Sequence, residues 1–186
     1  MNRPFLTLTL TLALSGCIIV PIPLPRASSS SGVGLAAVPL PDPGPAPATA
    51  NCPRPAEADQ ATSQIIARTN AFRKAHGLAP VRPSPRLTEV AQGHACDNAA
   101  RASYSHVSSD GGSLTTRLRR GGYLYAAAIE NTGLGFVDAP ERMSGFWEDS
   151  AGHRANLLNP KVTEAGLGLA EGSGGPAWVL VMAKPR

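Results

Sequence analysis

The sequence predicts an α+β fold in which helices come first along the chain and stack on a small antiparallel sheet at its end. Apolar residues recur with the helical period from about Asp59 onward. The last apolar run, Ala177 to Ala183, is almost unbroken and has the length of a buried strand. With 186 residues, the chain is long enough for one domain with a hydrophobic core.

Local start and stop signals place the helices. The first predicted helix runs from about Asp59 to Gly77, because a glycine is a natural C-terminal stop. The second begins at Ser84 and Pro85, which provide an N-cap and a first-turn proline. Three shorter helices are expected over 113–121, 138–148 and 152–158.

The C-terminal quarter is predicted to form two strands. Val162 to Leu169 is short and interrupted by glycines, and Ala177 to Ala183 suits a strand that is covered on both faces. The turn between them contains Gly172, Gly174 and Gly175. Two neighbouring strands joined by a short glycine-rich turn favour an antiparallel hairpin.

The N-terminus has the features of an export leader. Arg3 supplies a positive charge, and Phe5 to Leu14 is an apolar stretch that is too short to span a bilayer. Small residues then precede Cys17, and this pattern resembles the lipobox of bacterial lipoproteins. The resemblance implies removal of residues 1–16 as a signal peptide and a lipid anchor on Cys17. The alternative is an ordinary secretory leader followed by an unrelated cysteine.

Proline and serine dominate the segment that follows. Ten of the 18 prolines lie between Pro21 and Pro55. Such a segment has little apolar surface to bury and lacks many backbone donors, so residues 17–57 are predicted to be a disordered tether. The folded domain is predicted to cover residues 58–186.

Two cysteines remain besides Cys17. In an oxidising compartment, Cys52 and Cys96 form an even pair and are therefore expected to make a disulfide. A buried free Cys96 with an exposed Cys52 is the alternative.

The charge of the chain argues against nucleic acid as a partner. The formal net charge is only +4, and the one dense basic run consists of Arg117, Arg119 and Arg120. We interpret this run as a solvated helix face, with a phosphate or anionic-lipid contact as the alternative. No set of aromatic residues for base stacking accompanies it, which excludes nucleic acid.

Two of the four histidines are candidates for chemistry. His76 lies at a helix end and His94 on an apolar helix face, so both are interpreted as structural. His106 follows a helix and precedes a turn, whereas His153 falls in the first turn of a helix, where the dipole favours a neutral imidazole. Glu130 follows apolar residues and needs a partner if it is buried. By spacing alone these three residues predict a site only weakly.

Four motifs in order give a more specific indication. They are His94–Gly111, Ile129–Asn131, Trp147–Leu158 and Glu164–Gly168. This series resembles the CAP superfamily of cysteine-rich secretory, antigen 5 and pathogenesis-related proteins (SCP-like), and its short bacterial branch in particular. The resemblance covers about residues 62–184 and implies an α/β/α sandwich with a small antiparallel sheet between helices.

In that family a central cleft is lined by two histidines and two acidic residues. The resemblance assigns His106, Glu130 and His153 to three of these positions and implies that they are ligands for a divalent cation such as Zn²⁺, Ca²⁺ or Mg²⁺. The fourth position, usually acidic, is Ser150 here. One carboxylate fewer implies weaker metal binding.

Three functions are compatible with these residues. A binding module would hold a small molecule, a lipid or a cell-envelope component in the cleft, and we favour this function over catalysis. A metal-dependent, peptidase-like hydrolase is the first alternative. A non-catalytic structural protein, in which the polar residues only fix loops, is the second. The lipid anchor implies a membrane partner, and Ile18 in place of an inner-membrane retention Asp favours the outer membrane.

Overall fold

A computed structural model of the chain describes residues 41–136 and 140–186. The predicted signal peptide, Cys17 and the first part of the predicted tether lie outside the described residues, as does Asp138 at the start of a predicted helix. Within the described ranges, no helix is both long enough and apolar enough to cross a membrane.

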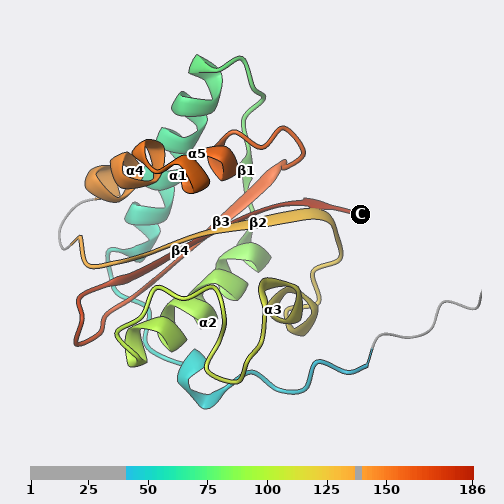
Figure 1. Ribbon diagram of the computed structural model, residues 1–186, viewed down its shortest axis with the longest axis vertical. Helices are drawn as coiled ribbons and strands as arrows, with labels where there is room; N and C mark the ends of the chain where they lie inside the picture. The colour runs from blue at the N-terminus through green and yellow to red at the C-terminus, as the bar shows by residue number, and fades with distance from the viewer. Residues whose placement is uncertain (1–40, 137–139) are drawn as a thin grey trace, which may run out of the picture. The chain divides into compact units, whose positions relative to one another are not determined.

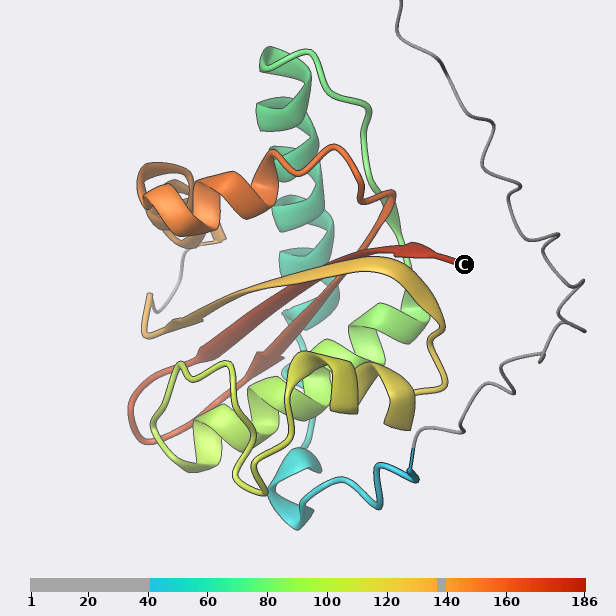
Figure 2. The ribbon, with the colours of Figure 1, turned by 45° about the vertical axis from the view of Figure 1, so that its right-hand side comes forward.

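The fold is α+β and has the three layers that the sequence predicts (Figures 1 and 2). Helices α1 (Ala58–Ala75), α4 (Pro140–Asp149) and α5 (Ala151–Leu157) cover one face of the sheet. Helices α2 (Pro85–Ala100) and α3 (Leu114–Arg120) lie on the other face. A short 3-10 helix, η1 (Ala48–Ala50), precedes α1 and contacts α2.

The sheet has four strands in the order β1-β3-β4-β2. The predicted hairpin is present as β3 (Glu164–Ala170) and β4 (Ala177–Pro185), which pair antiparallel. The two-residue strand β1 (Arg82–Pro83) pairs parallel with β3, so the sheet is mixed rather than purely antiparallel.

Strand β2 (Tyr125–Leu134) is a part of the sheet that the sequence pattern does not predict. After Tyr125 it continues with three alanines, which have little intrinsic preference for strands. Its conformation comes from long-range antiparallel pairing with β4, in which Glu130 is opposite Val181. Because β2 carries Glu130, this pairing determines where that carboxylate lies.

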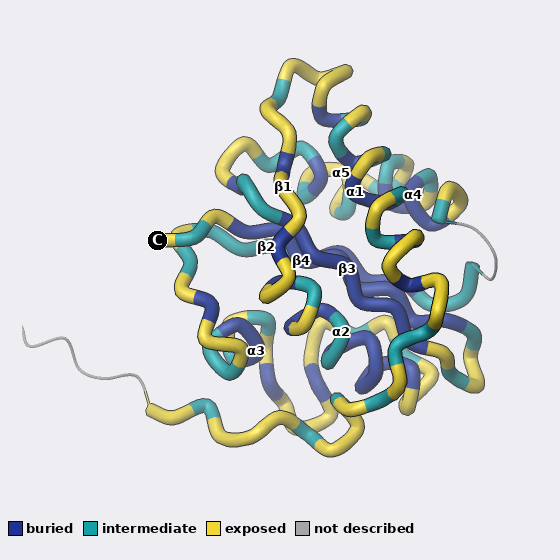
Figure 3. Tube along the Cα trace, turned by 180° about the vertical axis from the view of Figure 1, so that it is seen from behind, coloured by how far each residue is buried: buried dark blue, intermediate teal, exposed yellow. Residues whose placement is uncertain are grey.

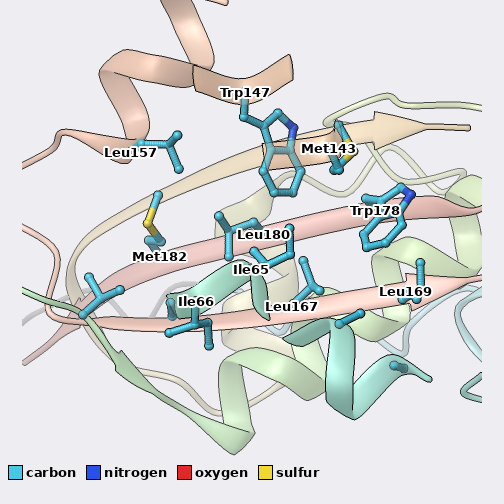
Figure 4. Packing of buried hydrophobic residues seen from close by; sticks show 14 of the residues in the cluster. Ile65, Ile66, Met143, Trp147, Leu157, Leu167, Leu169, Trp178, Leu180 and Met182 are labelled. Carbon is cyan, nitrogen blue, oxygen red and sulfur yellow. The ribbon is translucent and has the colours of Figure 1, made fainter. Parts of the chain in front are cut away.

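The core is divided by the sheet into two halves. Along β4 the side chains alternate, so that Trp178, Leu180 and Met182 pack toward α1 and α4 (Figure 4), whereas Val179 and Val181 pack toward α2. Figure 3 shows β3 and β4 buried along almost their whole length. The expectation of a strand covered on both faces is therefore confirmed.

The compact unit begins at Pro41, whereas the sequence assigns residues up to 57 to the tether. We call residues 41–57 the strap. Cys52 forms the expected disulfide with Cys96 of α2, with an S–S distance of 2.05 Å. Thr49 donates a hydrogen bond to Asp97, also on α2.

The basic run of α3 binds the strap. Arg119 donates to the carbonyl of Pro41, and Arg120 donates to that of Pro43 over 2.8 Å. These contacts and the disulfide supply the partners that a proline-rich segment cannot supply for itself. The interpretation of the run as a solvated face is wrong, because its guanidinium groups hold backbone carbonyls.

Candidate functional site

One cleft of about 520 Å³ lies between the loop after α2, strand β2 and helices α4 and α5. Both predicted histidines, His106 and His153, line it. The complete lining is Tyr104, Ser105, His106, Thr132, Gly133, Leu134, Phe136, Phe146 and His153. None of these described residues carries a carboxylate, an amine or a guanidinium group.

His106 is held from behind by Glu130. The Nδ1 atom of His106 lies 2.9 Å from Oε1 of Glu130, and a carboxylate oxygen can only accept, so Nδ1 donates. The side chain of His106 is 57% exposed, whereas that of Glu130 is 3% exposed. The imidazole is therefore fixed at one nitrogen and accessible from the cleft.

The loop that carries His106 is attached to β2 and closed on itself. Thr132 donates from Oγ1 to the carbonyl of Tyr104 over 2.6 Å. Ser105 accepts a hydrogen bond from the backbone of Val107 over 3.0 Å. These bonds limit the freedom of an otherwise exposed loop, so His106 has a defined direction.

Glu130 is a buried carboxylate with two donors. Its Oε2 atom receives a bond of 2.7 Å from Nη2 of Arg117, while Oε1 receives the bond from His106. Burial alone would raise the pKa of Glu130, but the His106 bond and the charge of Arg117 outweigh burial and hold this pKa below its usual value. Glu130 is therefore ionised at neutral pH.

Arg117 is a site residue that the sequence reasoning missed. Its Nη1 atom donates to three acceptors at 3.1 Å each, namely the His106 carbonyl, the Ser108 hydroxyl and the Gly112 carbonyl. Arg117 thus ties the His106 loop to Glu130. A signal was present, because Arg117 has helical spacing with Leu114 and Leu118. Leu118 and Arg117 are buried, and Leu114 is half-buried against the same core cluster.

His94 is the buried histidine of the network. It is 1% exposed and donates from Nε2 to the carbonyl of Ser105 over 2.8 Å, in agreement with the structural role predicted for it. The same nitrogen lies 4.0 Å from Oε1 of Glu130. Burial, with a smaller contribution from the Arg117 charge, lowers the pKa of His94 against the opposing influence of Glu130.

His153 reaches the cleft from the first turn of α5. Burial and then the charge of His106 lower its pKa, so the direction matches the neutral imidazole expected from sequence. Its ring centroid lies 5.4 Å from that of Phe146. Asn131 of β2 donates to the His153 carbonyl over 3.2 Å, and Asn156 of α5 donates to the Glu130 carbonyl over 3.0 Å.

Ser150 does not line the cleft. It is the N-cap residue of α5 and its side chain makes no capping hydrogen bond. The structure therefore brings His106 and His153 to one cleft, places Glu130 directly behind His106, and leaves Ser150 outside the lining.

The residues present do not fit a divalent cation. Both oxygens of Glu130 accept hydrogen bonds, and the Arg117 guanidinium already provides its counter-charge at 2.7 Å. In the part of the chain that the structure describes, no group of three His, Cys, Asp or Glu side chains is placed to hold a metal ion. The arrangement of His106, Glu130 and His153 therefore does not support the metal site that the resemblance implies.

Comparisons with known proteins agree with the motifs. The model of the cysteine-rich secretory protein family (CAP) matches residues 66–182. An uncharacterized membrane protein of Bacillus subtilis strain 168, YlbC, is 41% identical over 112 residues, which are 59% of this chain and 32% of YlbC. A second uncharacterized protein of that strain, YkwD, is 31% identical over 117 residues, covering 63% of this chain and 45% of YkwD.

A solved structure shows the same fold. The crystal structure of an extracellular protein containing an SCP domain from Bacillus anthracis strain Ames superposes with a TM-score of 0.60 and 29% identity. The superposition covers 72% of this chain and 45% of that one. The chain thus spans less than half the length of each of these three relatives.

Proposed function

Because the chain belongs to the cysteine-rich secretory protein (CAP) family, we propose that it is a ligand-binding module of the cell envelope, held outside the cytoplasm by a lipid on Cys17. The observation that carries the binding role is the convergence of two imidazoles, from segments remote in sequence, on one cleft. Concave sites that combine an apolar wall with few polar groups are typical of small-molecule binding.

The cleft combines these two kinds of surface. Leu134, Phe136 and Phe146 provide apolar area, and the rings of Phe136 and Phe146 lie 5.3 Å apart. Phe146 is 43% exposed in spite of its size. Large apolar side chains left accessible beside polar groups favour a ligand with both kinds of surface.

Hydrolysis is not proposed. A zinc hydrolase would need the Glu130 carboxylate or another third ligand, and Glu130 is paired with Arg117. Ser150, the one hydroxyl that the family pattern singles out, lies outside the cleft lining.

The envelope location is supported by the N-terminal sequence and by the descriptions of two relatives. The lipobox-like residues before Cys17 imply lipidation, and the residue after Cys17 is Ile18, which favours the outer membrane. The solved relative from Bacillus anthracis is described as extracellular, and YlbC as a membrane protein.

Binding is tested with the neutral, largely apolar fluorescent dye N-phenyl-1-naphthylamine. We expect saturable binding to the wild type and about tenfold weaker binding to Phe146→Asp, which places a charge in the apolar wall. The matched control is Leu124→Asp, since Leu124 is 71% exposed and lies outside the cleft lining.

Equal binding by both variants would show that the dye does not occupy this cleft. Absence of saturable binding to the wild type would favour the purely structural role of the polar residues. Circular dichroism checks that both variants are folded, which we expect because both side chains are exposed.

A further inference from the structure

The opposite charges of Glu130 and Arg117 neutralise each other behind the cleft lining. Glu130 and Arg117 are 3% and 7% exposed at the side chain and lie 2.7 Å apart. Neither residue lines the cleft. A ligand in the cleft therefore contacts the imidazoles of His106 and His153, and the neutral Glu130–Arg117 ion pair lies behind His106.

Arg117 supplies the positive charge that compensates the buried Glu130 carboxylate. A buried carboxylate without a partner is unstable, and a metal ion is one way to compensate it. In this chain the guanidinium compensates Glu130 permanently and also donates to the carbonyls of His106 and Gly112. Both oxygens of Glu130 therefore have donors from the chain itself.

The hydrogen bond between His106 and Glu130 determines which ring nitrogen of His106 can contact a ligand. Its Nδ1–H bond is directed to Oε1 of Glu130, so Nε2 is the ring nitrogen left for a ligand. An acidic group can share a proton with Nε2, either by donating it or by accepting a bond from the imidazolium. A quaternary ammonium group can do neither, and an alcohol gives only the weaker neutral bond.

No carboxylate among the described lining residues opposes an acidic group. The second imidazole, that of His153, also faces this cleft. Its pKa is lowered by burial and then by the charge of His106. The apolar wall at Leu134 and Phe146 then contacts the rest of the ligand.

We propose that the cleft selects an amphiphile with one acidic head group, and that Arg117 is the positioning residue that sets this preference by neutralising Glu130. The inference rests on the proposed binding function and adds the chemical class of the ligand.

The test displaces N-phenyl-1-naphthylamine with three probes that share a twelve-carbon chain, each below its micelle-forming concentration. The probes are dodecanoate, dodecanol and dodecyltrimethylammonium. We expect dodecanoate to displace the dye from the wild type at a concentration about tenfold or more below that needed with dodecanol or dodecyltrimethylammonium. One charge-assisted hydrogen bond provides a ratio of this size.

Two variants should change this ratio in opposite directions. Arg117→Gln leaves Glu130 uncompensated and should shift the preference from dodecanoate toward dodecyltrimethylammonium. Glu130→Gln leaves Arg117 uncompensated and should increase the preference for dodecanoate. Arg117→Lys keeps the charge and should keep the preference. Arg86→Gln and Glu89→Gln change exposed charges on α2 and should leave the ratio unchanged.

A role that is only structural would weaken all three probes alike and leave their ratio unchanged. Equal displacement by the three probes, or a ratio insensitive to both Arg117→Gln and Glu130→Gln, overturns the inference while the dye binding still supports the proposed function. Failure of the dye to bind the wild type overturns both. If Arg117→Gln does not fold, the Glu130→Gln ratio decides alone.

Discussion

His94 makes the stability of the domain sensitive to mild acid. The pKa of His94 is lower in the folded state than in the unfolded state, where it is about 6.5. Below about pH 6.5 the unfolded state therefore binds a proton at this residue more readily than the folded state does. The free energy of unfolding should therefore fall as the pH falls from 7 to 5, by at most about 1.4 kcal/mol per pH unit for this group. His153 has the same direction of shift and adds to the slope.

Urea unfolding of the wild type and His94→Gln at pH 7 and pH 5 measures this effect. Glutamine retains an N–H group for the Ser105 carbonyl but does not titrate, so we expect a smaller difference between the two pH values. An unchanged difference would assign the acid sensitivity to other groups.

The Arg117–Glu130 pair predicts a strong coupling between two substitutions. Arg117→Met leaves the buried Glu130 carboxylate with the His106 hydrogen bond but without its guanidinium counter-charge, which should cost about 3–5 kcal/mol of unfolding free energy. The double variant Arg117→Met/Glu130→Gln should recover part of that loss, because no charge remains buried. Thermal or urea unfolding of the single and double variants gives the coupling, with exposed Arg86→Met as a control expected within about 0.5 kcal/mol.

At the residue scale, the sequence predicted the two histidines and Glu130 but not how Glu130 is neutralised. His106 and His153 stand in recognisable motifs next to helix ends. Arg117 stands in a run of arginines, and its neighbours Arg119 and Arg120 bind the strap while Arg117 alone reaches Glu130. Which of these arginines binds which partner depends on the positions of the strap and of β2, and both positions are set by long-range contacts.

At the scale of elements, the approach of α2 to β3 depends on two glycines. A Cβ atom at Gly166 would lie 2.2 Å from the Thr88 backbone nitrogen, and one at Gly168 would lie 2.2 Å from the Ala91 carbonyl oxygen. The sequence indicated these glycines only as interruptions of a strand. The structure shows that they allow helix and strand backbones to touch.

Gly168→Ala should destabilise the fold by about 1–3 kcal/mol or more, since the backbone of α2 must move away. Gly145→Ala on α4 is the matched control, because no atom lies within 4 Å of its added Cβ. An alanine inside a helix should stabilise by about 0.5–1 kcal/mol. Similar melting temperatures for the two variants would show that the α2–β3 interface can expand freely.

The elements that the sequence predicted correctly are those with local signals. The start of α2 follows from Ser84 and Pro85, and the end of α1 is followed by Gly77 with a φ of +73°. Strand β2 and the strap have no such signals. The alanines of β2 pair with β4, and the proline-rich strap is held by hydrogen bonds from arginines of α3. Both segments therefore depend on partners that are distant in sequence.

At the scale of the whole molecule, attachment to a membrane is predicted to depend on one atom, the sulfur of Cys17. Cys17→Ala should move the full chain from the membrane fraction to the soluble fraction, because the substitution removes the sulfur that the predicted lipid anchor requires. Fractionation followed by immunoblotting measures this, with Cys52→Ala/Cys96→Ala as the cysteine control. A Cys17→Ala protein that stays with the membranes would contradict the lipid anchor.

The disulfide also determines how the domain would respond to pulling. Cys52 is bonded to Cys96, late in α2, and not to α1, the helix that follows it along the chain. Tension applied ahead of Pro41 would first break the carbonyl contacts made by Arg119 and Arg120. It would then pass through a covalent bond into α2, so α1 would remain outside the line of force and would not be peeled from the sheet.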